Sequence, residues 1–351
     1  MRPVPALLIA LLASASAEEL RLDQIQAIGS HNSYHVAPPP ALLEKIRGLN
    51  SGWSEAWNYT HPPLARQLEM GVRQFELDIF VDTKGGLFAE PLGLKLARLS
   101  GTKLDFNTGG ELSKPGIKVL HIPDMDCWTN APTLKLALEE VRAWSDKNPR
   151  HLPVMILLEC KDQPQPPLPT KPEPFSRERL LELEQEILSI IPQDHLLRPD
   201  DIRGDEKTLR EAVLKKGWPA IDSLRGKFLF CLDNTDEIRT RYLEGNPASE
   251  GRLIFVSAST EDHPSAAWFK CNDPLGEQAR IRKLVKQGFL VRTRSDTGKP
   301  DGKMRAAAFE SGAQWISTDH FTPGTKDRVD FGGSTVRPNP VTGKSGHHVE
   351  P

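Results

Sequence analysis

Short apolar segments rich in β-branched residues recur along the chain, and helical patterns are legible between several of them. The eight segments span residues 25–30, 72–80, 118–122, 153–159, 227–232, 253–257, 289–294 and 314–318. Continuous apolar strands of this length indicate burial on both faces, which is typical of a parallel sheet. Eight such strands with helical connections predict an α/β fold, the (β/α)8 barrel of the TIM type.

The segments between the strands support this prediction. Residues 133–145, 176–191 and 274–287 each carry apolar side chains at helical spacing. Residues 163–224 begin with a proline-rich stretch and form a long insertion between the fourth and fifth predicted strands. Because the end of the chain has no apolar period, we expect a barrel over residues 18–325 and an irregular tail over residues 326–351.

The N-terminus has the layout of a secretory signal peptide. Arg2 supplies a positive start, residues 6–13 are apolar, and Ala15, Ser16 and Ala17 are the small residues that a signal peptidase reads. The apolar run is shorter than the roughly 20 residues that a membrane span needs. We therefore expect residues 1–17 to be cleaved near Ala17 and the protein to be secreted or periplasmic. An uncleaved N-terminal helix is the alternative.

The four cysteines fit an oxidising compartment, and none of them has metal-ligand spacing. Cys127 and Cys160 follow neighbouring predicted strands, as do Cys231 and Cys271, so these two pairs are the preferred disulfides. Buried free thiols are the alternative.

The charge balance argues against one class of partner. The formal net charge is −2, and no arginine-rich segment is interleaved with aromatic residues. We therefore expect no nucleic-acid partner, and no feature of the sequence predicts an obligate protein partner.

Polar residues occupy the ends of the first four predicted strands, where the active sites of such barrels lie. Residues 30–34 follow the first strand, Glu76 and Asp78 lie in the second, and the third and fourth end in His121 and Glu159. Because side chains alternate along a strand, Glu76 and Asp78 face the same way. Two carboxylates directed into one site repel each other unless a cation lies between them.

These strand ends offer a set of oxygen ligands and two separate imidazoles. The proposed ligands are Asn32, Glu76, Asp78 and Glu159. An all-oxygen set suits Ca²⁺ or Mg²⁺ better than zinc, and the number of hard ligands favours Ca²⁺. Phosphodiester cleavage requires charge stabilisation at phosphorus and a proton for the leaving alkoxide, which His31 and His121 are able to supply.

Two of these stretches resemble motifs of the phosphoinositide-specific phospholipase C family. Residues 28–34, IGSHNSY, are similar to the opening motif of its catalytic barrel, and residues 75–78, FELD, resemble its metal-binding strand. His121 and Glu159 follow in the order that the family requires. The resemblance covers about residues 25–319 and is closest to the small bacterial calcium-dependent members, which are secreted barrels without regulatory domains.

The resemblance implies a role for each residue at the strand ends. Asn32, Glu76, Asp78 and Glu159 would hold calcium, His31 would stabilise charge at phosphorus, and His121 would act as the general acid. The substrate would be a phosphatidylinositol-type lipid met transiently at a membrane surface. Attack by the inositol 2-hydroxyl would release diacylglycerol and a cyclic phosphodiester. Either Glu76 or Glu159 would accept the hydroxyl proton, and the sequence leaves that choice open.

Other polar residues at the barrel mouth are weaker candidates for substrate binding: Lys161, Ser257, Arg292, Arg294 and Asp319. Lys161 could bind phosphate or pair with a carboxylate of the site. Arg292 and Arg294 alternate onto one face of their strand and could bind inositol hydroxyls, phosphate or a structural carboxylate. Trp53 and Trp57 could touch lipid or pack locally.

Two other functions fit parts of the pattern. A glycerophosphodiester phosphodiesterase also uses a barrel, a Glu-x-Asp pair and two histidines, but that family typically continues its first histidine with Arg-Gly. This chain has Asn32 and Ser33 there. A catalytically silent barrel that binds lipid or carbohydrate is the second alternative, which the presence of both histidines and all three carboxylates disfavours.

Overall fold

The computed structural model describes residues 19–99, 101–343 and 349. The expected signal peptide at residues 1–17 lies outside these described residues.

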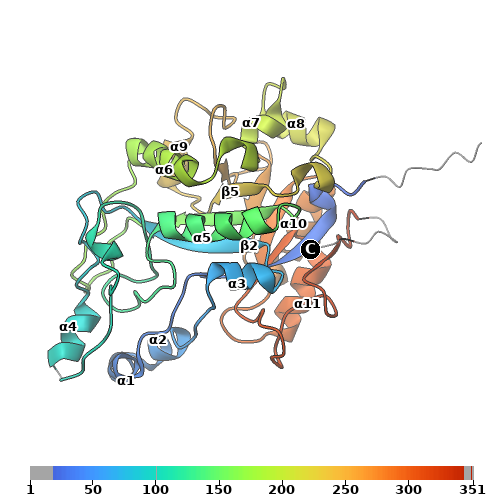
Figure 1. The fold of residues 1–351 in the computed structure, drawn as a ribbon. Helices are drawn as coiled ribbons and strands as arrows, with labels where there is room; N and C mark the ends of the chain where they lie inside the picture. The colour runs from blue at the N-terminus through green and yellow to red at the C-terminus, as the bar shows by residue number, and fades with distance from the viewer. Residues whose placement is uncertain (1–18, 100, 344–348, 350–351) are drawn as a thin grey trace, which may run out of the picture.

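Two five-stranded sheets form the centre of the described part of the chain (Figure 1). Their orders are β10-β1-β9-β8-β7 and β3-β2-β4-β5-β6. The strands are β1 Ile25–Ser30, β2 Gln74–Phe80, β3 Lys118–Val119, β4 Val154–Cys160, β5 Phe228–Leu232, β6 Phe255–Val256, β7 Trp268–Lys270, β8 Leu290–Arg294, β9 Trp315–Thr318 and β10 Val336–Pro338. Only β3 and β10 run antiparallel to their neighbours; the other pairings within these sheets are parallel.

The helices lie between and around the strands. They are α1 Pro40–Leu49, α2 Ser51–Ala56, α3 Leu64–Glu69, α4 Leu92–Leu99, α5 Leu134–Lys147, α6 Arg177–Ile190, α7 Pro199–Arg203, α8 Leu209–Lys216, α9 Glu237–Tyr242, α10 Pro274–Lys286 and α11 Gly302–Ser311. Short 3₁₀ helices occupy Leu22–Gln24, Glu111–Ser113, Gln193–His195 and Ile221–Leu224. The helices predicted over 133–145, 176–191 and 274–287 are confirmed as α5, α6 and α10, and the Thr133, Ser176 and Asp273 side chains cap their first turns.

The predicted α/β architecture with parallel central strands is confirmed, but two of the strand predictions are wrong. The segment predicted over 118–122 pairs only at Lys118–Val119, at a sheet edge and antiparallel to β2. Strand β7 was not predicted, because its three residues are too short to give a recognisable apolar run. The edges of the two sheets approach each other where the Arg73 amide donates to the Ile28 carbonyl at 2.9 Å and where Ser257 bridges Trp268.

The segments predicted as a tail and as an insertion both contain regular secondary structure. Within the expected irregular tail, β10 pairs antiparallel with β1, with Ile25 opposite Pro338. A strand of this length carries no period that a sequence pattern could reveal. The region predicted as an insertion, 163–224, contains α6, α7 and α8, and Leu180, Leu183 and Ile187 of α6 join the main apolar core.

All four cysteines are free and buried, so the predicted disulfides Cys127–Cys160 and Cys231–Cys271 are wrong. Each thiol packs as a small apolar group. Cys160, at the end of β4, lies in the main apolar core, and Cys231 and Cys271 lie together in a second core. Burial raises the pKa of the Cys231 thiol well above its usual value, which keeps it protonated and unreactive.

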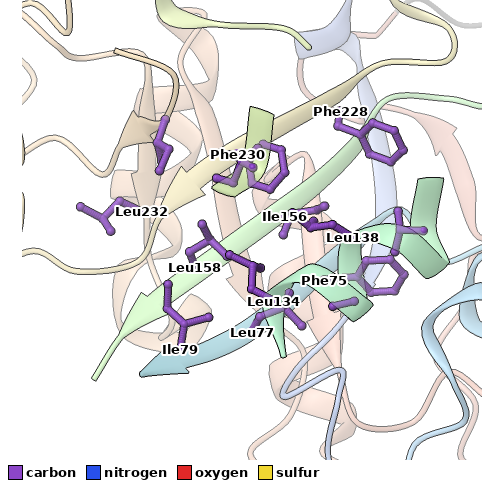
Figure 2. Close-up of a cluster of buried hydrophobic side chains, with 14 of the residues drawn as sticks. Phe75, Leu77, Ile79, Leu134, Leu138, Ile156, Leu158, Phe228, Phe230 and Leu232 are labelled. Carbon is purple, nitrogen blue, oxygen red and sulfur yellow. The ribbon is translucent and has the colours of Figure 1, made fainter. Parts of the chain in front are cut away.

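Alternation along the central strands separates the apolar core from the polar site. Phe75, Leu77 and Ile79 of β2 lie with Leu134 and Leu138 of α5 in the cluster shown in Figure 2. Glu76 and Asp78, which alternate with them, therefore point to the opposite face of the strand. The apolar face of β2 thus holds the strand against α5 while its other face carries the carboxylates.

Helices α1, α2 and α4 form a lobe set apart from the sheets (Figure 1). Leu42, Ile46, Trp57 and Met125 form the buried core of this lobe. Across the described ranges, no helix combines the length and apolar character that a membrane crossing requires.

Candidate active site

A cavity of about 460 Å³ lies between the ends of the central strands and helix α2. The predicted site residues that line it are His31, Asn32, Asp78, His121, Glu159, Lys161, Arg294 and Asp319. Residues from the first long loop close another side of it: Glu55, Trp57 and Tyr59. The structure therefore brings together residues that are far apart in the sequence.

The turn after β1 is shaped by the close approach of β1 to β2. A Cβ atom at Gly29 would lie 2.1 Å from Oε1 of Gln74, so only glycine fits there. Asn32 has a φ of 43°, in the left-handed region that asparagine tolerates better than most residues. The Ser33 amide donates to the Glu76 carbonyl at 3.0 Å, which fixes the turn beside β2.

Three carboxylates converge at the base of the cavity. Oxygens of Glu76, Asp78 and Glu159 lie within 4.8 Å of one another. Neither oxygen of the buried Asp78 accepts a well-formed hydrogen bond. Burial and the nearby Glu159 raise the pKa of Asp78 well above its usual value. Buried carboxylate oxygens that accept no well-formed hydrogen bond, held beside other carboxylates, fit a hard divalent cation as their partner.

Glu76 is held from behind by Arg292. One guanidinium nitrogen of Arg292 bonds Glu76 and Ser317, and another donates to Asn272 Oδ1 at 2.5 Å. Burial alone would raise the pKa of Glu76, but Arg292 and His31 lower it below its usual value. Glu76 is therefore ionised, with one carboxylate oxygen 3.9 Å from His31 Nε2.

Two of the weaker candidates do not lie where a substrate-binding role requires. Arg292 is fully buried and is not among the residues that line the cavity, because its guanidinium is used by protein groups. Ser257 is also buried, away from the cavity, and its hydroxyl accepts a hydrogen bond from the Lys270 amide at 3.0 Å. The structure thus gives both side chains partners within the protein, away from the cavity lining.

His31 is oriented by a buried carboxylate. Asp319 Oδ1 lies 3.1 Å from His31 Nδ1 and 3.6 Å from His61 Nε2. Burial alone would raise the pKa of Asp319, but His31 and His61 lower it below its usual range. The ionised Asp319 accepts a hydrogen bond from Nδ1–H, which directs Nε2 of His31 toward Glu76.

His121 has a similar arrangement with a different carboxylate. Its Nδ1 lies 2.6 Å from Oδ2 of Asp126, whose side chain is fully buried. A second imidazole, His35, reaches the same carboxylate with Nε2 at 2.9 Å. The ring of His35 stacks on Tyr59 at 4.0 Å between centroids, and Tyr59 is in turn bonded to Asn32. His121 is thus held by a buried network that leads back to the turn after β1.

The partners of the two imidazoles were not assigned from the sequence. Asp126 and Tyr59 lie in loops with no strand pattern, and Asp319 was noted only as a polar strand end. His35, His121 and Asp126 also satisfy the spacing of a three-ligand metal group, but their contacts are those of hydrogen bonds. Only the structure shows that each candidate histidine has its own carboxylate.

The chain is similar to known proteins over most of its length. A family model described as phosphoinositide phospholipase C, Ca²⁺-dependent, matches residues 20–340. A calcium-dependent phosphoinositol-specific phospholipase C from the Gram-negative bacterium Pseudomonas sp has a similar fold, with a TM-score of 0.58, 15% identity and coverage of 91% of this chain and 95% of that chain.

A Ca²⁺-dependent phosphatidylinositol-specific phospholipase C from Streptomyces antibioticus is also similar in fold. It aligns with a TM-score of 0.56 and 18% identity, and the alignment covers 91% of this chain and 99% of that chain. The comparison with curated proteins finds no match. Because the family model spans most of the chain, the predicted family is confirmed: the chain belongs to the Ca²⁺-dependent phosphoinositide phospholipase C family.

Proposed function

We propose that this chain cleaves phosphatidylinositol-type lipids to diacylglycerol and an inositol phosphate, with a cyclic phosphodiester as the first product. The observation that carries the proposal is the pair of carboxylate-held imidazoles, His31 and His121, on the same cavity as Asp78 and Glu159. Two imidazoles and an acidic cluster are the groups that metal-assisted transfer of a phosphodiester requires.

The residues at the strand ends fit calcium. Asn32, Glu76, Asp78 and Glu159 would hold the ion, which when bound supplies positive charge that lowers the pKa of the attacking hydroxyl and stabilises the phosphoryl oxygens. The convergence of three carboxylates, with Asp78 accepting no well-formed hydrogen bond, is the structural reason for this assignment. Glu159 lines the cavity whereas Glu76 does not, which favours Glu159 as the group that accepts the hydroxyl proton.

His31 and His121 would handle charge and protons on the two sides of phosphorus. His31, oriented by Asp319, would place its Nε2–H toward a phosphoryl oxygen and stabilise its developing charge. His121, oriented by Asp126, would give the proton from Nε2 to the diacylglycerol oxygen as it leaves. Arg294 lines the cavity 3.8 Å from Asp319 and is the arginine placed to meet the headgroup.

We also infer that the two sheets are the halves of a (β/α)8 barrel over residues 18–325. The Arg73–Ile28 hydrogen bond and the Ser257–Trp268 bridge support closure at the two edges. The expected export signal at 1–17 remains a proposal, and N-terminal sequencing of the exported protein tests it. A mature N-terminus near Glu18 is expected; retention of Met1 would contradict it.

Hydrolysis assays separate the three candidate functions. The purified protein is incubated with phosphatidylinositol or with glycerophosphoinositol, with calcium and with a chelator, and the products are followed by ³¹P NMR. We expect calcium-dependent cleavage of the lipid with a cyclic phosphate signal. Release of glycerol 3-phosphate from the deacylated diester would favour the glycerophosphodiester phosphodiesterase, and silence on both substrates would favour a binding barrel.

Exposed apolar side chains on the lobe that contributes α2 to the cavity support contact with a lipid surface. Leu49, Trp53 and Leu99 are 70%, 47% and 85% exposed, and all three lie in the lobe formed by α1, α2 and α4. Trp53 stacks on Trp57, which lines the cavity. We therefore propose that this lobe touches the membrane and delivers the lipid headgroup to the cavity.

Trp53→Ala is expected to weaken binding to phosphatidylinositol vesicles about five-fold, because an interfacial indole contributes about 1 kcal/mol of transfer free energy. Activity on a water-soluble inositol phosphodiester is expected to stay normal. Leu214→Ala, at a 41% exposed position on α8, is the matched control. Equal vesicle binding by both variants would remove the lobe from membrane contact.

Asp126→Asn is expected to reduce kcat on phosphatidylinositol roughly 10²-fold or more, because the amide no longer holds His121 as the Nδ1–H tautomer. The loss should shrink for a substrate with a 4-nitrophenolate leaving group, which departs without a proton. An equal loss on both substrates would show that Asp126 does not act through the general acid.

A further inference from the structure

Lys161 contacts two of the proposed calcium ligands. Its Nζ lies 2.6 Å from Glu159 Oε1 and 3.3 Å from Asp78 Oδ2. The Lys161 ammonium is therefore at ion-pair distance from both carboxylates. A positive charge thus sits among oxygens to which a divalent cation would bind.

The backbone of Lys161 is fixed by a hydrogen bond, and its side chain lies on the open cavity. The residue follows β4 directly, and its amide donates to the Ile79 carbonyl at 2.9 Å. The side chain lines the cavity and is 26% exposed. Its flexible stem allows the ammonium to move several ångströms without moving the strand.

Arg292, which also pairs with a carboxylate of the site, is held more tightly than Lys161. It pairs with Glu76, but it is fully buried and also bonds Asn272 and Ser317. Its planar group is therefore held from several sides, whereas the Lys161 ammonium is paired, among the described residues, with the two carboxylates. Among the cations that line the cavity in the described chain, Arg294 lies beside Asp319 and Lys299 is 2.8 Å from Glu55. Lys161 is the one placed on the acidic cluster.

We propose that Lys161 is a tethered cation that competes with calcium for Asp78 and Glu159 and that, once calcium displaces it, its ammonium binds the phosphate of the substrate. The proposal rests on the proposed function, in which these carboxylates hold calcium. Like charges cannot share the same oxygens at hydrogen-bond distance without strong repulsion. Displacement by calcium would turn the ammonium toward the cavity where the anionic headgroup enters.

The competition has a thermodynamic consequence. Calcium binding to the carboxylates and anion binding to the ammonium each favour the other. An anion that binds the ammonium leaves Asp78 and Glu159 free to bind calcium. Calcium and an anionic ligand should therefore strengthen each other's binding, by the same factor in both directions. Removal of the ammonium should strengthen calcium binding and weaken this coupling.

Calorimetry of calcium binding with Lys161→Met and Lys299→Met tests the proposal. Lys299→Met removes an equal charge from the cavity rim and is the matched control. We expect calcium to bind at least ten-fold more tightly to Lys161→Met and within two-fold of normal to Lys299→Met. Calcium should increase the affinity of the unmodified protein for inositol 1-phosphate, the anionic probe. In Lys161→Met this increase should be at least five-fold smaller. Unchanged or weaker calcium binding by Lys161→Met would overturn the proposal.

A measurement on the unmodified protein does not depend on the folding of the variant. Acetylation of Lys161 by acetic anhydride, followed by mass spectrometry, should be slow without calcium and several-fold faster with it, while Lys299 reacts equally in both. Equal reactivity of Lys161 in both conditions would overturn the proposal. If the unmodified protein binds no calcium by calorimetry, the proposed function itself fails; if it binds calcium and cleaves lipid but Lys161 behaves as Lys299 does, only this inference fails.

Discussion

His31→Ala is expected to lower kcat for phosphatidylinositol cleavage by about 10²–10⁴-fold, with a much smaller change in KM. The imidazole faces Glu76 on one side and is anchored by Asp319 on the other. Its ring is therefore oriented to stabilise charge that develops at phosphorus. Groups aimed at developing charge contribute to the transition state more than to substrate binding, and their loss appears in kcat. Steady-state kinetics on mixed micelles measure both constants.

His263→Ala serves as the control for His31→Ala. The imidazole of His263 is hydrogen-bonded to Ser265 in its own loop, and His263 does not line the cavity. We expect normal kinetics for this variant and an unfolding transition for His31→Ala close to that of the unmodified protein. Near-normal turnover by His31→Ala would remove this imidazole from the mechanism. The same experiment applies to His121, for which we expect a loss of similar size.

Asp78→Asn is expected to have two effects of opposite sign. Calcium affinity should fall roughly 10²-fold or more, and activity should fall with it, because a buried ligand loses its charge. The free energy of unfolding measured without calcium should rise by at least about 1 kcal/mol. Burial and Glu159 raise the pKa of Asp78, so its ionised form destabilises the fold at pH 7.

The sign of this effect follows from linkage. A carboxyl with a raised pKa stabilises the fold below its unfolded-state value, and that stability is lost as the pH rises through the folded-state value. Asp78→Asn removes this loss, so its gain in stability should be larger at pH 8 than at pH 4. Chemical denaturation at both pH values with a chelator measures it. A variant that binds calcium normally, or that is less stable than the unmodified protein at pH 8, would contradict the role of Asp78.

Features that repeat along the chain could be predicted, and features set by tertiary contacts could not. Long apolar strands and capped helices gave the correct elements at β2, β4, β5 and α5. The antiparallel edge strand β3 and the added strands β7 and β10 exist because neighbouring strands offer them hydrogen bonds. Three residues in an extended state leave no periodic trace in a sequence.

The same distinction between local pattern and tertiary contact applies to the candidate site. The Glu-x-Asp alternation in β2 and the polar ends of β1 and β4 placed Asn32, Asp78 and Glu159 on one cavity. The deep burial of Arg292 could not be predicted, because strand alternation says which face a side chain occupies and not how deep it lies. Asp126 was missed because nothing in its loop marks it as the partner of His121. Contacts between loops are set by the whole fold and not by local pattern.

Crystals of the protein grown with calcium would test the central claim most directly, through an anomalous difference map. The account predicts a single calcium peak bounded by carboxylate oxygens of Glu76, Asp78 and Glu159 and the amide oxygen of Asn32, with Lys161 turned away from it. A calcium peak elsewhere on the molecule, or no peak at saturating calcium while the Lys161 ammonium still bridges Asp78 and Glu159, would contradict the account.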